Sequence, residues 1–242
     1  MRRDRKTQSD AQREKTLHKN LSFTAAEAYK LLRTNIQFLL PGEDEAKCKI
    51  IGVISSIYGE GKSTTSINLS YVLAEAGKRV LLIDGDMRLP SVANNMQLEN
   101  APGLSNTLVS SGNKDNRAIV RKSELFDNWY IMTAGDIPPN PSELLGSNRM
   151  RSLLTVLSQQ FDYIIVDLPP VNMVSDALTI SPMLDGLLLV VREDYITRKE
   201  VSACVHQLNI AGAKVLGVVM NCVKTSQMVY GKRKKYKYYY QE

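Results

Sequence analysis

A short run rich in glycine and hydroxyl side chains carries the most specific chemistry in this sequence. It reads Ser55-Ser56-Ile57-Tyr58-Gly59-Glu60-Gly61-Lys62-Ser63-Thr64 and follows a short apolar run. Glycines let the backbone turn tightly enough for its N–H groups to converge on phosphate oxygens, and a helix beginning there adds partial positive charge. Lys62 would reach the β- and γ-phosphates of a nucleotide, and the Ser63 hydroxyl would ligate Mg²⁺. Ser56 replaces the first glycine of the usual G-x-x-x-x-G-K-[ST] pattern, so this phosphate-binding loop (P-loop) is a variant.

Three aspartates follow two further apolar runs. Val80–Ile83 leads into Asp84-Gly85-Asp86, and Tyr163–Val166 leads into Asp167. An aspartate at the end of a parallel strand lies at the ligand-binding edge of the sheet, where it can hold Mg²⁺ or its waters. Any one of them could equally be a helix cap or turn former. Three around a P-loop favour a phosphate site in which Asp167 is the Walker B carboxylate.

The elements that must position these residues alternate along the chain. Strands are predicted at 50–54, 80–83, 129–132, 163–166, 187–191 and 215–220, and helices near 63–76, 141–160 and 198–211. Gly77 stands where a left-handed residue would end the first of these helices. Strands that are apolar throughout are typical of a parallel sheet covered on both faces. We therefore predict an α/β fold, a doubly wound and mostly parallel sheet of the P-loop NTPase type in a single domain.

A further helix is predicted before the first strand. Thr24 and Glu27 fit a capping box at its start, and Pro41-Gly42 would end it. Its predicted apolar face consists of Ala28, Leu31, Leu32, Ile36 and Leu39.

The composition limits the remaining possibilities. The chain has 242 residues, 43% of them hydrophobic, which suits one domain at 23–229 between a basic arm at 1–22 and a tail at 230–242. No window has the apolar length of a membrane span, and the amino terminus has no apolar signal region. The three cysteines show no metal-ligand spacing and suit reduced thiols. We therefore expect a cytoplasmic protein.

The positive charge is concentrated at the two ends. The formal net charge is +6, and residues 1–20 and 230–242 each contribute +4, which leaves −2 for the body between them. A nucleic-acid-binding domain usually carries its basic stripe on the folded surface, so no nucleic-acid partner is expected.

Five of the eleven tyrosines lie in the last thirteen residues: Tyr230, Tyr236, Tyr238, Tyr239 and Tyr240. By itself this basic, aromatic tail would fit a membrane or nucleic-acid contact.

The elements GEGKST, LLIDGDMRLP and IIVDLPP together resemble the Walker A, A′ and B motifs of bacterial tyrosine kinases (BY-kinases), the capsule and exopolysaccharide family with deviant Walker motifs. The similarity continues through residues 103–105, 138–145 and 175–177 to the tail, and covers roughly residues 24–242. It implies a protein-tyrosine kinase that uses ATP and Mg²⁺ and phosphorylates a tyrosine cluster at its own carboxyl end in trans.

The resemblance also implies roles for individual residues. Nucleotide binding falls to Gly59, Glu60, Gly61, Lys62, Ser63 and Thr64, with Asn221 similar in position to an adenine-contacting asparagine. Catalysis and Mg²⁺ fall to Lys62, Ser63, Asp84, Asp86 and Asp167. Either Asp84 or Asp86 would take the proton of the acceptor tyrosine, and the sequence does not decide which. Arg88 could meet a phosphate or form a surface ion pair, and a strand-end asparagine is also a common turn former.

Assembly and phosphorylation sites follow from the same resemblance. The expected phosphorylation sites are Tyr236, Tyr238, Tyr239 and Tyr240, with Tyr230 as a further candidate. Glu27, Lys30 and Arg33 form E-x-x-K-x-x-R, similar to the E-x-x-R-x-x-R motif by which these kinases assemble into rings. Lys30 departs from that motif, because lysine lacks the bidentate fork of arginine. The same three residues also fit a helix cap with solvated charges.

The implied partners are other copies of the chain, a separate transmembrane adaptor that activates it at the inner face of the plasma membrane, a tyrosine phosphatase, and protein substrates in polysaccharide synthesis. Two alternatives remain. An ATPase switch of the chromosome-partitioning or division-site kind shares the fold, but its additional P-loop lysine is replaced here by Ile57. The other alternative is a scaffold that binds ATP without catalysis. Evidence against it is that the candidate catalytic residues are all present: Lys62, Asp84, Asp86 and Asp167.

Overall fold

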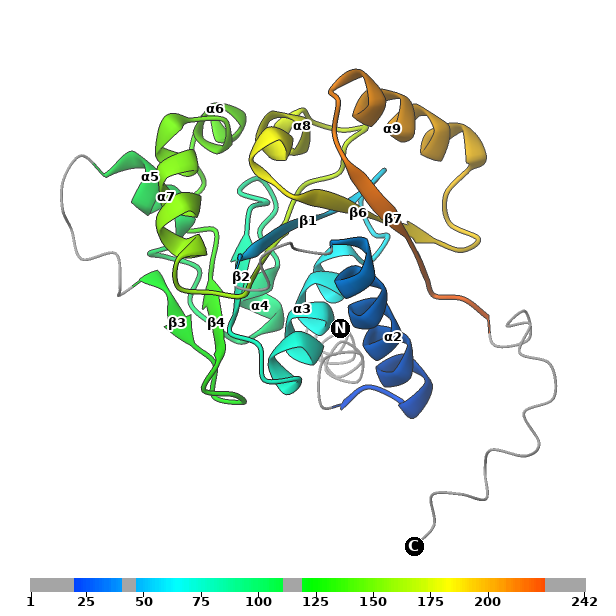
Figure 1. Cartoon of the computed structure of the whole chain (residues 1–242). Coiled ribbons are helices and arrows are strands. Elements are labelled where there is room, and N and C mark those ends of the chain that lie inside the picture. The colour runs from blue at the N-terminus through cyan, green and yellow to red at the C-terminus, as the bar shows by residue number, and fades with distance from the viewer. Residues whose placement is uncertain (1–19, 41–46, 111–118, 225–242) are drawn as a thin grey trace, which may run out of the picture.

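Apolar strands stack side by side at the centre of the fold because neither of their faces carries a polar stripe. In the computed structural model, residues 20–40, 47–110 and 119–224 are described, and within them the strands form one sheet of seven. The order is β3-β4-β2-β5-β1-β6-β7, and all neighbours are parallel except the short edge pair of β3 and β4 (Figure 1). The strands are β1 (Lys49–Ser55), β2 (Val80–Asp84), β3 (Arg121–Lys122), β4 (Trp129–Met132), β5 (Tyr163–Asp167), β6 (Gly186–Arg192) and β7 (Val215–Asn221).

Helices cover both faces of the sheet. One face packs against α2 (Phe23–Leu39), α3 (Lys62–Glu75) and α4 (Val92–Asn95). The other face packs against α5 (Leu104–Val109), α6 (Pro141–Leu145), α7 (Asn148–Ser158), α8 (Asp176–Ile180) and α9 (Arg198–Ile210), as Figure 1 shows. A short 3₁₀ helix, η3 (Ser181–Met183), follows α8. The predicted doubly wound α/β class is therefore confirmed, and the predicted strands lie within one residue of the observed ones.

Two turns show how the sequence ends its helices. Gly77 follows α3 with φ +82°, the left-handed conformation expected at that position. The helix predicted at 141–160 is wrong as a single element, because it breaks into α6 and α7. Gly146 and Ser147 lie between them, and Ser147 Oγ accepts from Met150 N at 3.2 Å to begin α7. Gly146 passes so close to Thr179 that a Cβ there would collide with it.

The prediction for α2 was wrong in two details. Its N-cap is Ser22, whose Oγ accepts from Ala25 N at 3.3 Å, so Thr24 lies inside the helix and makes no capping box. The face toward the core is also rotated: Ile36 is fully buried and Leu32 is partly buried. The other predicted core residues are exposed: Ala28, Leu31 and Leu39. The cause is that α2 packs mainly against α3 and buries only a narrow stripe. Pro41-Gly42 lies outside the described residues.

None of the helices in the described part of the chain is both long and apolar enough to cross a membrane.

Candidate active site

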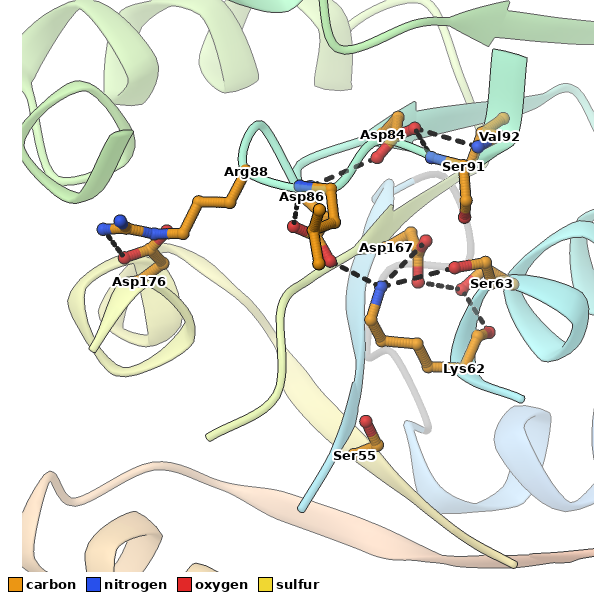
Figure 2. A network of polar contacts seen from close by, with 12 residues as sticks. Ser55, Lys62, Ser63, Asp84, Asp86, Arg88, Ser91, Val92, Asp167 and Asp176 are labelled. Atoms are coloured by element: carbon orange, nitrogen blue, oxygen red, sulfur yellow. Dashed lines mark hydrogen bonds and ion pairs between the residues drawn. The ribbon is translucent and has the colours of Figure 1, made fainter. Parts of the chain in front are cut away.

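Three strands bring the polar residues of the site to one edge of the sheet. The P-loop follows β1, Asp84 ends β2, and Asp167 ends β5. Asp84 and Asp167 are register partners on neighbouring strands, so their carboxyl groups start from adjacent backbone positions. Figure 2 shows the Asp167 carboxylate beside Lys62, which opens α3, and the Asp84 carboxylate directed at the backbone of Ser91 and Val92. The sheet topology therefore assembles the residues that the sequence predicted to meet.

The P-loop requires glycine at two positions. Gly59 and Gly61 have φ values of +84° and +92°, which strain any residue with a Cβ. A Cβ on Gly61 would collide with Asn221 Nδ2, and one on Gly59 would meet the Tyr195 hydroxyl. The close approach of β7 to the loop thus explains why Gly61 cannot be substituted without displacing Asn221.

Glu60 braces the P-loop from within. Its carboxylate is buried and accepts from Ser56 N at 2.7 Å and Ile57 N at 2.9 Å. The other carboxylate oxygen accepts from Arg192 N at 3.3 Å, and Asn221 Nδ2 donates to the Glu60 carbonyl at 2.8 Å. The sequence analysis placed Glu60 and Asn221 on the nucleotide. In the structure both side chains tie the loop to the ends of β6 and β7, and their contact with the nucleotide stays a prediction.

Lys62 is the cationic centre of the cluster. Its Nζ lies 2.9 Å from Asp86 Oδ2 and 3.5 Å from Asp167 Oδ2, and it donates to Ser63 Oγ at 3.3 Å (Figure 2). Asp167 is further bonded by the Ser63 hydroxyl and accepts from Ser66 Oγ at 3.1 Å. Ser66 lies one helical turn after Lys62, and the sequence analysis missed it. A buried lysine between two carboxylates is held in place before any phosphate arrives.

The two aspartates of the β2 end have different surroundings. Both carboxylate oxygens of Asp84 accept hydrogen bonds from backbone N–H groups. Oδ1 accepts from Asp86 N at 3.2 Å, and Oδ2 accepts from Ser91 N at 3.1 Å and from Val92 N at 3.0 Å. Asp86 uses only Oδ1 in this way, accepting from Leu89 N at 3.0 Å, while its Oδ2 faces Lys62. Asp86 Oδ2 is buried and faces the Lys62 ammonium at 2.9 Å, with no backbone N–H bound to it. Asp86 therefore has a carboxylate oxygen available for chemistry, and Asp84 shapes the loop.

Burial and mutual charge shift the proton affinities of the cluster. Burial, followed by the charge of Asp167, raises the pKa of Asp84 to about 7. Burial also raises the pKa of Asp167, against the opposing charge of Lys62. For Lys62, burial lowers the pKa, but the charges of Asp167 and Asp86 outweigh it and raise the pKa above its ordinary value. Lys62 is therefore charged at neutral pH.

Thr64 lies in the first turn of α3 and is partly buried. Among the described residues, no three acidic, histidine or cysteine side chains converge as a ready-made metal site. The hard oxygen donors beside Lys62 nevertheless suit Mg²⁺, which is usually held by one or two carboxylates together with phosphates and waters.

Outside this cluster lie the predicted assembly residues. Lys30 Nζ pairs with Glu27 Oε1 at 3.0 Å on the surface of α2. Arg33 is used within the chain, donating from Nη1 to Val72 O on α3 at 2.7 Å. Tyr230, Tyr236, Tyr238, Tyr239 and Tyr240, the predicted phosphorylation sites, lie outside the described residues.

A phosphate-binding loop between the first strand and a helix of a parallel sheet, with aspartates ending two neighbouring strands, defines a P-loop NTPase. Comparisons with known proteins support this class. A family profile described as an AAA domain matches residues 48–216.

Curated relatives and solved structures are more specific. Tyrosine-protein kinase YwqD of Bacillus subtilis is 35% identical over 88% of this chain and 86% of its own length. Putative tyrosine-protein kinase CapB of Staphylococcus aureus is 34% identical over 93% of this chain and 94% of its own. The kinase domain of the Escherichia coli tyrosine kinase ETK superposes with a TM-score of 0.74 at 34% identity, covering 83% of this chain and 78% of that one. The chimerical protein CapA2B2 superposes with a TM-score of 0.72 at 34% identity, covering 79% and 82%.

The chain belongs to the bacterial tyrosine-protein kinase family, as its motifs predicted. The septum site-determining protein MinD of Pyrococcus horikoshii has a TM-score of 0.57 at 21% identity, covering 72% of this chain and 70% of that one, and so shares the fold alone. The division-site switch considered as an alternative is therefore not favoured.

Proposed function

We propose that this kinase transfers the γ-phosphate of ATP to tyrosines in the carboxyl-terminal tail of another copy of the chain. The observation that carries the proposal is the buried ammonium of Lys62 at the P-loop, held between Asp86 and Asp167. The acceptors in this proposal are Tyr236, Tyr238, Tyr239 and Tyr240, with Tyr230 as a further candidate.

The proposed mechanism rests on charge and position. Phosphoryl transfer needs in-line placement and neutralisation of the phosphate oxygens more than covalent help. Lys62 and the backbone N–H groups of the P-loop supply positive charge to the phosphates. Asp86, with Oδ2 directed into the cluster, would orient the tyrosine hydroxyl. A tyrosine has an ordinary pKa of about 10 and an aspartate of about 4, so Asp86 accepts the proton only as the new O–P bond forms.

The oxygen donors fit the expected cofactor Mg²⁺. The Ser63 hydroxyl and the Asp167 carboxylate would hold it, with Asp84 in reach through water. When bound, Mg²⁺ neutralises charge on the phosphate oxygens. Asn221 would help to place the nucleotide indirectly, because its amide fixes the carbonyl of Glu60 in the P-loop.

Substitution of the central residues tests the proposal. In Lys62→Met and Asp167→Asn variants we expect phosphotyrosine formation with Mg-ATP to fall at least about 100-fold. The first variant removes the positive charge that neutralises the phosphates, and the second removes the carboxylate that would hold Mg²⁺ and pairs with Lys62. Lys224→Met, at an exposed lysine, is the matched control and should retain activity. Far-ultraviolet circular dichroism checks the fold. Phosphotyrosine appearing in Lys62→Met at the wild-type rate would refute the proposal.

The partners belong to the same proposal. By resemblance to the family, the proposal includes a separate transmembrane adaptor that brings the kinase to the inner face of the plasma membrane. It also includes a role in capsule or exopolysaccharide synthesis and a phosphatase that reverses the modification. Phe23 and Phe38 are each 78% exposed on α2, the helix that also carries Glu27 and Lys30, which supports self-association in a ring. The rate of tail phosphorylation, compared with and without the adaptor's cytoplasmic peptide, tests the adaptor. Equal rates would exclude activation.

A further inference from the structure

The ion pair between Arg88 and Asp176 has no role in the proposed transfer mechanism. Arg88 Nε and Nη2 donate to the two carboxylate oxygens of Asp176 at 2.9 and 3.0 Å, a bidentate geometry (Figure 2). The Asp176 side chain is completely buried, whereas that of Arg88 is 38% exposed. A buried carboxylate left without its cation is strongly unfavourable, so this pair constrains Arg88 far more than a surface ion pair would.

Arg88 lies in the A′ loop, residues 85–91, which carries Asp86 to the P-loop lysine. Both ends of the loop are held by Asp84, whose oxygens accept from Asp86 N at its start and from Ser91 N at its end. Its tip has no such support from Asp84. At the tip, Arg88 points away from Lys62 and reaches across to α8 (Figure 2).

Asp176 connects this tip to the rest of the site. It is the first residue of α8, which follows the segment after Asp167. That segment is bonded to the backbone of the P-loop start, because Val171 N and Asn172 N donate to the carbonyl oxygens of Ser55 and Ser56 at 2.9 and 3.1 Å. The ion pair therefore joins the A′ loop to a segment that is already fixed to the P-loop and to the end of β5.

We propose that Arg88 and Asp176 are a positioning pair, which holds the A′ loop so that Asp86 Oδ2 stays directed at Lys62 and at the phosphate being transferred. Neither residue touches the substrate. This inference rests on the proposed kinase activity. A misplacement of a reacting group by about 1 Å can cost on the order of 100-fold in rate, so loosening the loop would act on the transfer step.

Nucleotide binding should be largely spared. The side-chain contacts that shape the P-loop come from Glu60 and Asn221, and these bonds do not involve Arg88 or Asp176. Loss of the Arg88 contact leaves those bonds intact. The expected signature is therefore a fall in kcat with little change in KM for ATP.

The test compares Arg88→Ala, Arg88→Lys, Asp176→Asn and the double variant Arg88→Ala with Asp176→Asn. We expect Arg88→Ala and Asp176→Asn each to lower kcat for tail phosphorylation by about 10- to 100-fold. KM for ATP and Kd for Mg-ADP should stay within about 3-fold. Because both residues act as one unit, the double variant should be no more than about 3-fold slower than the worse single one. Arg88→Lys, which keeps the charge without the fork, should lie between wild type and Arg88→Ala.

Controls distinguish positioning from direct phosphate contact and from a purely structural role. Lys122→Ala breaks the exposed pair with Asp127 and should leave kcat unchanged. If Arg88→Ala unfolds because Asp176 is left unpaired, the double variant removes that charge and keeps the test valid.

Wild-type kcat in Asp176→Asn with an inactive Arg88→Ala would overturn the proposal, since Arg88 would then act on the phosphates itself. A lowered unfolding midpoint with unchanged kcat would also overturn it, because the pair would then only stabilise the fold. An inactive wild type would instead refute the proposed function.

Discussion

At the scale of single residues, the structure distinguishes two aspartates that look equivalent in the sequence. Asp84 has both carboxylate oxygens on backbone N–H groups, whereas Asp86 leaves Oδ2 facing Lys62. We therefore propose Asp86 for the reactive role and Asp84 as the residue that folds the A′ loop.

Asp86→Asn tests this division. The amide keeps Oδ1 to accept from Leu89 N but removes the negative charge toward Lys62. We expect kcat to fall by about 10²- to 10⁴-fold, the usual contribution of a general base, with Kd for Mg-ADP nearly unchanged. Asp194→Asn, the same chemical change at an exposed position, is the control. Near wild-type turnover in Asp86→Asn would return the base role to Asp84.

The raised pKa of Asp84 predicts a pH dependence of stability in metal-free protein. The folded state holds the Asp84 proton up to about pH 7, whereas an unfolded aspartate releases it near pH 4. The folded state thus binds more protons between these values, and its free energy of unfolding falls as pH rises from about 4 to about 7. The loss is of the order of a few kcal/mol.

Denaturant unfolding in EDTA across this pH range measures the effect. The free energy of unfolding should fall more steeply with rising pH in wild type than in Asp84→Asn, whose side chain does not titrate. Identical slopes for the two proteins would show that folding does not raise the pKa of Asp84.

At the scale of elements, the conformation of the P-loop depends on the close approach of Asn221 at the end of β7. Gly61→Ala would force a Cβ against Asn221 Nδ2 at φ +92°, so we expect nucleotide affinity to fall by more than about 100-fold. Gly77→Ala is the matched control. It has φ +82° but open space around the added Cβ, and should cost about 1 kcal/mol of stability without affecting nucleotide binding.

The double variant Gly61→Ala with Asn221→Ala separates collision from backbone strain. It relieves the collision, so part of the affinity should return, as measured by titration with Mg-ADP. If no affinity returned, the loss in Gly61→Ala would come from strain in the backbone conformation at residue 61 and not from the collision with Asn221.

How far the sequence predicts these elements depends on how local their causes are. The strands and the P-loop follow from apolar runs and glycines a few residues apart. The break at Gly146 depends on contact with Thr179, and the burial of α2 depends on how it rests on α3. Neither partner is visible in the local pattern. In the site, the candidate carboxylates were found from their strand-end positions, but the pairing of Arg88 with Asp176 spans 88 residues and required the folded chain.

At the scale of the whole molecule, the charge distribution suggests that phosphorylation controls assembly. The tail at 230–242 carries a net charge of +4, while the body at 21–229 carries −2 and gathers Asp84, Asp86 and Asp167 at the site. We therefore expect an unmodified tail to be attracted to the acidic site of a neighbouring copy.

Each phosphotyrosine adds about −1.5 to −2 charge near neutral pH. Phosphorylation of three or four of the residues Tyr236, Tyr238, Tyr239 and Tyr240 would make the segment neutral or acidic. The neighbouring carboxylates would then repel it, and we expect a ring held partly by α2 to loosen. Because Arg33 is bonded to Val72 O within the chain, we expect Glu27 and Lys30 to supply the charged contacts of α2 with a neighbour.

Light scattering at physiological salt tests this switch, with the mass measured before and after complete phosphorylation. Wild type should lose mass on phosphorylation, and a variant with the four tail tyrosines changed to phenylalanine should keep it. The variant preserves the tail's positive charge and aromatic character, so only the phosphates differ. A second comparison at about 1 M salt, where charges are screened within about 3 Å, should weaken assembly of both proteins if the attraction is electrostatic. An unchanged wild-type mass after phosphorylation would mean that the tyrosines mark the protein for a phosphatase or another binder without acting on assembly, and the kinase assignment would stand.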